Sequence, residues 1–177
     1  MICQNLKLFS VLLSFLTIKQ AILAIEDCPK DWIDAQNLKM GCINLNGTKS
    51  MAWNDAQDFC HSLNINAHLV EIFSEEQQQF MVLQALLHED QGIPRNWWIG
   101  LTDEESEGTW YWSKSNRVAE FTSWGTGQPT NIGCGGGGLS ANYGVLAHWV
   151  SYNWSDYDLT SALCGSPNYP ICQISIL

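Results

Sequence analysis

The residues of this chain that most clearly predict a chemistry are its cysteines. Six of the seven lie after residue 27, at Cys28, Cys42, Cys60, Cys134, Cys164 and Cys172. An even number of cysteines in an exported domain predicts disulfides, and six cysteines allow 15 pairings, among which the sequence alone does not choose. A metal cluster is a poor alternative, because no Cys-x-x-Cys spacing occurs and the four histidines are scattered.

The N-terminal segment is typical of a secretory signal peptide, which would remove the seventh cysteine, Cys3. Lys7 precedes a largely apolar run over residues 8–18, and small or apolar residues continue to Ala24. The apolar run is too short to span a bilayer, and a buried N-terminal helix is the alternative. We therefore expect a signal peptide over residues 1–24 and one exported domain over residues 25–177, with no membrane span and an extracellular location.

The charge of the chain restricts its partners. The formal net charge is −10 at pH 7, and it becomes −12 when the two lysines of the leader are removed. An acidic surface disfavours nucleic acid and anionic lipid. It is compatible with cations, neutral glycans or basic proteins, and also with a charge that serves only solubility.

The hydrophobic pattern predicts two helices in the first half of the exported region. Ser50 is placed to cap a helix that continues to about Asn64. Ser74 and Gln77 form a capping box at the start of a second helix, which Gly92 would end. The apolar face of the first helix is expected at Ala52, Ala56, Phe59 and Leu63. That of the second is expected at Phe80, Leu83, Leu86 and Leu87.

Short strands and one long loop are expected around these helices. A β-hairpin arm is predicted over residues 28–48, and further strands over 67–72, 97–101, 109–112, 144–150 and 169–176. Residues 113–142 have no periodicity and include four consecutive glycines at 135–138. A loop of this length within a compact domain is usually functional.

Several short motifs together indicate a family. They are "CPKDW" at the start, "AWNDAQDFC", "WWIGL" around Trp98-Ile99-Gly100-Leu101, "GQPT", "WSD" and the closing "CGSPNYPIC". In this order and spacing the chain resembles the C-type lectin-like domain in its long form, from Cys28 to Cys172. The resemblance implies an α+β fold with two helices, two small antiparallel sheets and a long irregular loop. It also implies the pairs Cys28–Cys42, Cys60–Cys172 and Cys134–Cys164.

The resemblance also indicates where a ligand would bind. In the family, a calcium ion and a sugar are held by Glu-Pro-Asn or Gln-Pro-Asp in the long loop, by a following acidic residue and by a strand-borne Trp-Asn-Asp. Gln128 and Asp156 match two of these ligands as the metal residues of a weak site, whereas Thr130 and Ser155 replace two others. No acidic residue precedes Cys134. With one carboxylate left, calcium is expected to bind in the millimolar range or not at all.

Two features still favour a sugar ligand. Gln-Pro is the galactose-leaning variant of the family's loop motif, and Asn131 extends the candidate ligand set of Gln128, Thr130, Ser155 and Asp156. Aromatic rings also cluster near the loop, and pyranose rings stack on such side chains without a metal. Tyr143 is the expected exposed ring, whereas Trp149 and Trp154 are expected in the core.

Two sequons predict N-glycosylation, at Asn46 and at Asn153. The first lies in an expected turn. The second abuts the candidate site, where either a glycan would displace the ligand surface toward residues 134–143 or burial around Trp154 would leave Asn153 bare.

The sequence favours a secreted carbohydrate-recognition module with a degraded calcium site, possible galactose preference and no enzymatic activity. The alternative is a calcium-independent protein-binding module on the same fold. Catalysis is disfavoured because no nucleophile-elbow or metalloprotease motif is present.

Overall fold

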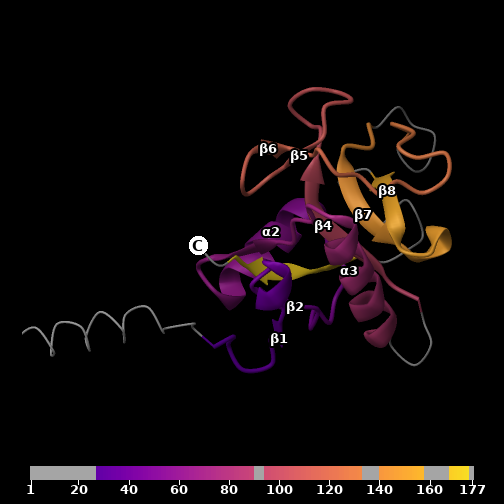
Figure 1. The fold of residues 1–177 in the computed structure, drawn as a ribbon. Coiled ribbons are helices and arrows are strands. Elements are labelled where there is room, and N and C mark those ends of the chain that lie inside the picture. The colour runs from indigo at the N-terminus through magenta and orange to yellow at the C-terminus, as the bar shows by residue number, and fades with distance from the viewer. Residues whose placement is uncertain (1–26, 90–93, 133–139, 158–167, 176–177) are drawn as a thin grey trace, which may run out of the picture.

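The computed structural model describes residues 27–89, 94–132, 140–157 and 168–175. These residues form an α+β domain of two sheets and two α-helices, as the sequence predicts (Figure 1). None of the helices within them is long and apolar enough to cross a membrane. The predicted signal peptide and the Cys134–Cys164 pair fall outside the described residues.

The first sheet brings the two ends of the domain together. Its order is β1-β2-β10-β3, with antiparallel pairing throughout, and its strands are β1 (Ile33–Asp34), β2 (Cys42–Asn44), β10 (Cys172–Ile174) and β3 (Ala67–Leu69). A 3₁₀ turn, η1 (Gln36–Leu38), lies between β1 and β2 and completes the predicted hairpin arm.

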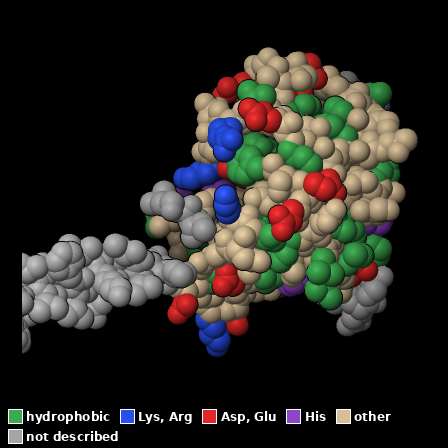
Figure 2. Space-filling view, viewed as in Figure 1, with side chains coloured by type: hydrophobic (Ala, Val, Ile, Leu, Met, Phe, Trp, Pro, Cys, Tyr) green, Lys and Arg blue, Asp and Glu red, His purple; other side chains and the backbone are tan. Residues whose placement is uncertain are grey.

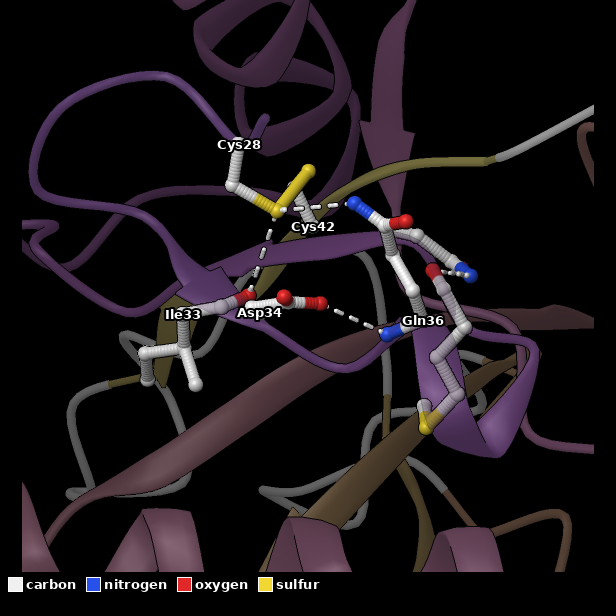
Figure 3. The surroundings of a disulfide bond; sticks show 7 residues. Cys28, Ile33, Asp34, Gln36 and Cys42 are labelled. Carbon is white, nitrogen blue, oxygen red and sulfur yellow. Dashed lines mark hydrogen bonds between the residues drawn. A yellow bond between two sulfur atoms is a disulfide. The ribbon is translucent and has the colours of Figure 1, made fainter. Parts of the chain in front are cut away.

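Two disulfides close this part of the fold. Cys28 is bonded to Cys42 beside the β1–β2 hairpin, where the Gln36 backbone N–H donates to Asp34 (Figure 3). Cys60 on α2 is bonded to Cys172 on β10. Both pairs are those that the family resemblance implies.

The second sheet carries the candidate site. Its main path is β6-β5-β4-β7-β8, and β9 (Asn168–Pro170) pairs in parallel with β4 (Asn96–Thr102). The other strands are β5 (Tyr111–Trp112), β6 (Arg117–Val118), β7 (Tyr143–Ala147) and β8 (Asn153–Tyr157). Except for β6, residues 113–132 contain no strand within the described part of the loop, which agrees with the lack of sequence periodicity.

The structure explains why the Trp-Ile-Gly-Leu tetrad contains a glycine at position 100. A Cβ at this position would lie 2.9 Å from the carbonyl oxygen of Leu69, closer than real side chains approach. Its N–H donates to the carbonyl of Val70 at 2.8 Å, and its own carbonyl accepts from the N–H of Ser113 at 2.8 Å. Only glycine therefore allows β4 to pass this close to the chain that follows β3.

The helices form where expected but present different faces to the core. Helix α2 (Trp53–Leu63) begins after Ala52, which is the N-cap without a side-chain hydrogen bond, so the predicted cap at Ser50 is wrong. Its buried residues are Trp53, Ala56 and Cys60, and Leu63 is exposed. The Trp53 indole N–H donates to the carbonyl of Ile99 at 2.9 Å and fixes α2 against β4.

Helix α3 (Glu75–Leu87) begins at the predicted cap, Ser74, whose hydroxyl accepts from the N–H of Gln77 at 3.3 Å. The Gln77 side chain accepts from the N–H of Phe73 at 2.7 Å, one residue before the cap. The predicted apolar face is wrong for three of its four residues, because Leu83, Leu86 and Leu87 are exposed. The buried residues are Gln77, Gln78, Met81 and Ala85.

The inner face of α3 carries glutamine where the sequence pattern predicts leucine, because polar groups of the chain beneath it need hydrogen-bond partners. Gln78 is 2% exposed; it accepts from the Trp154 indole N–H at 2.7 Å and donates to the carbonyl of Tyr152 at 2.9 Å. A buried indole N–H without a partner would destabilise the fold, so the amide side chain is favoured there. The helix is thus attached to β8 through hydrogen bonds as well as apolar contacts.

Candidate functional site

The strand β8 positions the motif Trp154-Ser155-Asp156. On one edge it pairs with β7, where Gly144 lies opposite Asp156. On its other edge the loop runs alongside: the Trp154 N–H donates to the carbonyl of Ser123 at 2.7 Å, and the Gly125 N–H donates to the carbonyl of Trp154 at 2.8 Å. The side chain of Trp154 lies in the core at 0% exposure. Its backbone N–H and carbonyl lie in the plane of the sheet and bind the loop.

The carboxylate of Asp156 organises the loop. It accepts hydrogen bonds from the backbone N–H of Thr130 at 2.8 Å, from the Thr130 hydroxyl at 3.3 Å, and from the backbone N–H of Asn131. Hydrogen bonds to an ionised acceptor are about twice as strong as neutral ones. Asp156 is 5% exposed, so its carboxylate interacts mainly with these loop groups and little with solvent.

Gln128 completes the contact between the loop and the strand. The peptide bond between Gln128 and Pro129 is cis, and the Gln128 side-chain oxygen accepts from the backbone N–H of Asp156 at 3.3 Å. The structure therefore brings together the two positions that the resemblance marks as ligands. Gln128 is half-buried, whereas Thr130 and Asn131 are exposed.

These residues fit a calcium ion poorly. Calcium takes six to eight oxygen ligands, and the cluster offers one carboxylate, two side-chain amides and one hydroxyl. The carboxylate oxygens already accept N–H and O–H donors, which a cation would have to displace. Across the described ranges, no group of three or more His, Cys, Asp or Glu side chains could hold a metal ion.

Two aromatic residues differ from expectation. Tyr143, expected to be exposed, is only 4% exposed on β7, and its ring packs 4.8 Å from that of Trp53. Burial also raises the pKa of its hydroxyl well above the usual value. Trp149, expected in the core, is 51% exposed. Trp154 is buried as expected, in edge contact with Trp112 and Trp124.

Ser155 does not reach the candidate surface, because it is 1% exposed. Of the six residues expected to contact a ligand, the structure brings together Gln128, Thr130, Asn131 and Asp156 and separates them from the buried Ser155 and Tyr143. The strand pattern could not show this, because one face of β8 is covered by α3 at Trp154 and the other packs with Trp98 at Tyr157.

One buried carboxylate was not expected from the sequence. Asp103 follows the end of β4 and is 2% exposed; its Oδ2 accepts from the N–H of Gly108 at 2.8 Å, while its Oδ1 has no hydrogen-bond partner. Burial, with a smaller effect of the nearby Glu107 carboxylate, raises the pKa of Asp103 above its usual range. Nothing in the composition of the segment distinguishes Asp103 from its exposed acidic neighbours.

Curated proteins include relatives of this chain in sequence. The chain is 32% identical over 133 residues to lithostathine-2 of Mus musculus, which covers 70% of this chain and 75% of that protein. It is 30% identical over 126 residues to the hepatic lectin of Gallus gallus, covering 70% of this chain and 50% of that one. Several relatives are therefore longer than the region they share with this chain.

Solved structures show the same fold. The mouse scavenger receptor C-type lectin carbohydrate-recognition domain matches with a TM-score of 0.67 and 26% identity, covering 85% of this chain and 100% of that one. Human lithostathine at 22% identity, with a TM-score of 0.66 over 86% of this chain and 94% of that one, shows likeness of fold alone. The model of the Lectin C-type domain matches residues 49–174, which include both helices and the Gln128–Asp156 cluster. The chain therefore belongs to the C-type lectin domain family.

Proposed function

We propose that this chain is a secreted carbohydrate-recognition module that binds a neutral, galactose-like glycan through Gln128, Thr130, Asn131 and Asp156, with little or no need for calcium. The observation that carries the proposal is the contact between Asp156 and the loop. It gives the loop a defined shape through protein hydrogen bonds. The related structure from the mouse scavenger receptor C-type lectin is a carbohydrate-recognition domain, which supports the proposal.

The groups at this surface suit hydroxyl ligands. The Gln128 amide and the exposed Thr130 and Asn131 side chains offer both donors and acceptors, as a polyol requires. Asp156 acts mainly as a positioning residue, because its carboxylate is nearly buried and fixes the backbone of Thr130 and Asn131. Pre-organising the loop reduces the entropic cost of ligand binding.

Export of the chain is part of the same proposal. Two disulfides in the described structure are consistent with an oxidising compartment. The acidic composition, with a formal net charge of −10, is compatible with a neutral glycan.

A glycan array, probed with and without a calcium chelator, tests the function. We expect binding to a galactose-containing glycan that persists in chelator and is lost in Gln128→Ala and Asp156→Asn. Asp58→Asn, which changes an exposed carboxylate on α2, is the matched control and should bind normally. Binding that appears only with calcium would refute the metal-independent site, and no binding to any glycan would refute the function.

A protein-binding module is the second candidate. The observation that favours it is the row of exposed leucines on α3, Leu83, Leu86 and Leu87, at 53%, 50% and 68% exposure. Figure 2 shows hydrophobic side chains gathered at the lower right of the view, where α3 lies in Figure 1. Contiguous apolar surface of this kind often marks a protein contact. Loss of partner binding in Leu86→Gln, with glycan binding absent, would support this candidate over the first.

A further inference from the structure

Trp149 presents a rigid aromatic surface away from the loop. It lies in the 3₁₀ turn η2 (His148–Val150) that connects β7 to β8, and it is 51% exposed, whereas the other tryptophans are buried or half-buried. The turn is closed by hydrogen bonds from the N–H of Ser151 to the carbonyl of His148 at 3.0 Å and from the N–H of Tyr152 to that of Ala147 at 2.9 Å.

The orientation of the indole ring is also fixed. Its Nε1–H donates to the hydroxyl oxygen of Tyr157 at 3.0 Å, in a contact that is only partly buried. A tryptophan whose N–H is already bonded keeps its ring face free for contact, at little entropic cost on binding. The exposed face of Trp149 is therefore a pre-formed platform.

Asn96 determines the polar character of the groups beside this platform. Its Oδ1 accepts from the backbone N–H of His148 at 3.1 Å, so this atom is an acceptor, and the His148 Nδ1 that lies 2.9 Å from it must carry a proton. In a neutral imidazole the other nitrogen, Nε2, is then an acceptor.

Tyr157 holds the indole ring in place and is itself only 5% exposed. Its oxygen accepts from the Trp149 indole at 3.0 Å and from the Asn96 amide at 3.3 Å, so its own proton points to neither. Burial raises the pKa of Tyr157, which keeps the hydroxyl protonated at neutral pH. The platform thus has the half-buried imidazole of His148 next to it, while the buried Tyr157 fixes the ring from beneath.

Asn168 is a buried polar residue on the same side of the sheet as Asn96. It pairs with Asn96 in register between β9 and β4, so the two side chains project from the same face. Asn168 is 0% exposed, and neither atom of its amide has a hydrogen-bond partner. Buried polar groups are normally satisfied, so this amide is unusual, but at 0% exposure it lies beneath the surface and does not contact a ligand there.

This cluster is separate from the loop surface. Asp156 and Tyr157 are successive residues of β8, so their side chains leave opposite faces of the strand. The Asp156 side chain contacts Thr130 and Asn131, whereas that of Tyr157 contacts Trp149 and Asn96. Substitutions can therefore affect one surface without the other.

We propose that Trp149 is the stacking platform of a second surface that binds a neutral pyranoside, with His148 Nε2 as acceptor and Tyr157 as the positioning residue of the indole ring. The apolar C–H face of a pyranose ring fits a flat indole, and a ring hydroxyl can donate to the imidazole nitrogen. A charged ligand would find no counter-charge in this cluster. The proposal is independent of the loop surface.

Saturation-transfer NMR with methyl β-galactopyranoside tests this surface, with methyl α-mannopyranoside for comparison, in buffer containing a chelator. We expect transfer to the ring protons of at least one glycoside by wild-type protein and also by Asp156→Asn, in which the loop surface no longer contributes. The substitutions at Trp149 and Tyr157 are therefore compared in the Asp156→Asn background. Trp149→Ala should weaken binding by about tenfold or more, and Tyr157→Phe should also weaken it. Trp149→Phe, which retains a ring, should keep most of the binding.

Two further variants separate the surfaces. Leu87→Ala, which removes another exposed apolar side chain, is the matched control and should have no effect. Asp156→Asn should leave transfer through Trp149 unchanged. No transfer to either glycoside, or equal transfer in Trp149→Ala, would overturn the inference. Loss in Asp156→Asn alone would also overturn it while leaving the loop function intact. Loss in Trp149→Ala alone would support it and count against the loop as the site for this probe.

Discussion

Buried polar side chains at β8 show how single residues define this domain. Gln78 satisfies the Trp154 indole and the Tyr152 carbonyl from one side, and Asp156 binds Thr130 and Asn131 from the other. Each polar group is paired within the chain, which is the condition for burial without large cost. Asp103 differs from these residues, because one of its oxygens, like the amide of Asn168, is buried without a partner.

Asp103 should make stability depend on pH. Burial raises its pKa in the folded state, whereas the unfolded chain has the ordinary value near ~3.9. Between these two values the folded state binds more protons, so the free energy of unfolding falls as pH rises through that window. We expect Asp103→Asn to gain in melting temperature relative to wild type as pH increases from about 4 to 7. A difference between the two proteins that does not change with pH would contradict this expectation.

The two sequons should differ in occupancy. Asn46 is exposed, whereas Asn153 is half-buried and its side-chain oxygen accepts from the Ser123 hydroxyl at 3.2 Å. The next two residues, Trp154 and Ser155, are buried at 0% and 1% exposure. Mass spectrometry of protein from a eukaryotic host should find a glycan on Asn46 and a bare Asn153. An occupied Asn153 would favour the hypothesis that the ligand surface has moved to residues 134–143.

At the scale of elements, α3 is reversed relative to its sequence pattern. Its leucines face outward, and its inner face combines Met81 and Ala85 with two glutamines. Aromatic side chains of the sheet already supply apolar surface beneath α3. The helix adds hydrogen-bond partners for the Trp154 indole and the Tyr152 carbonyl. This arrangement leaves an apolar stripe on the surface.

The reversal predicts opposite effects from similar substitutions on α3. Leu83→Gln and Leu86→Gln should each change the free energy of unfolding by less than about 0.5 kcal/mol. Met81→Ala should cost about 2–5 kcal/mol, because Met81 is 0% exposed. Urea denaturation measures both, with matching m-values as the check for two-state unfolding. A large loss on changing the leucines would show that they are covered in the native protein.

For the whole molecule, the bond between Cys60 and Cys172 is the main covalent restraint within the described chain. It joins residues 112 positions apart and ties α2 to the last strand, whereas Cys28–Cys42 spans 14. The chain-entropy model gives about 4–5 kcal/mol for the long loop and about 3 kcal/mol for the short one.

The paired alanine variants test this difference. Replacing Cys60 and Cys172 should lower the free energy of unfolding more than replacing Cys28 and Cys42, by roughly 1–2 kcal/mol. Guanidinium denaturation under non-reducing conditions measures it. Equal losses would indicate that residual structure in the unfolded chain, or packing around the cysteines, outweighs loop closure.

The sequence predicted the family and the order of the elements, and the family resemblance implied the two disulfide pairs that the structure contains. These features depend on local signals: the Trp-Ile-Gly-Leu tetrad on β4, the cap at Ser74, and the positions of Cys28, Cys42, Cys60 and Cys172. Each is encoded within a few residues or in a spacing that the family shares. The Gln128–Asp156 contact also matches two positions that the resemblance marks.

Only the tertiary structure decided which side chains face the solvent. Helical periodicity shows that Leu83 and Leu86 share a face, but not that the sheet is already covered and that Gln78 is needed against Trp154. Tyr143 is buried because Trp53 of α2 packs against its ring, and Trp149 is exposed because the chain turns at η2. Burial is a property of the neighbours that long-range packing brings to a residue, and composition and spacing do not contain it.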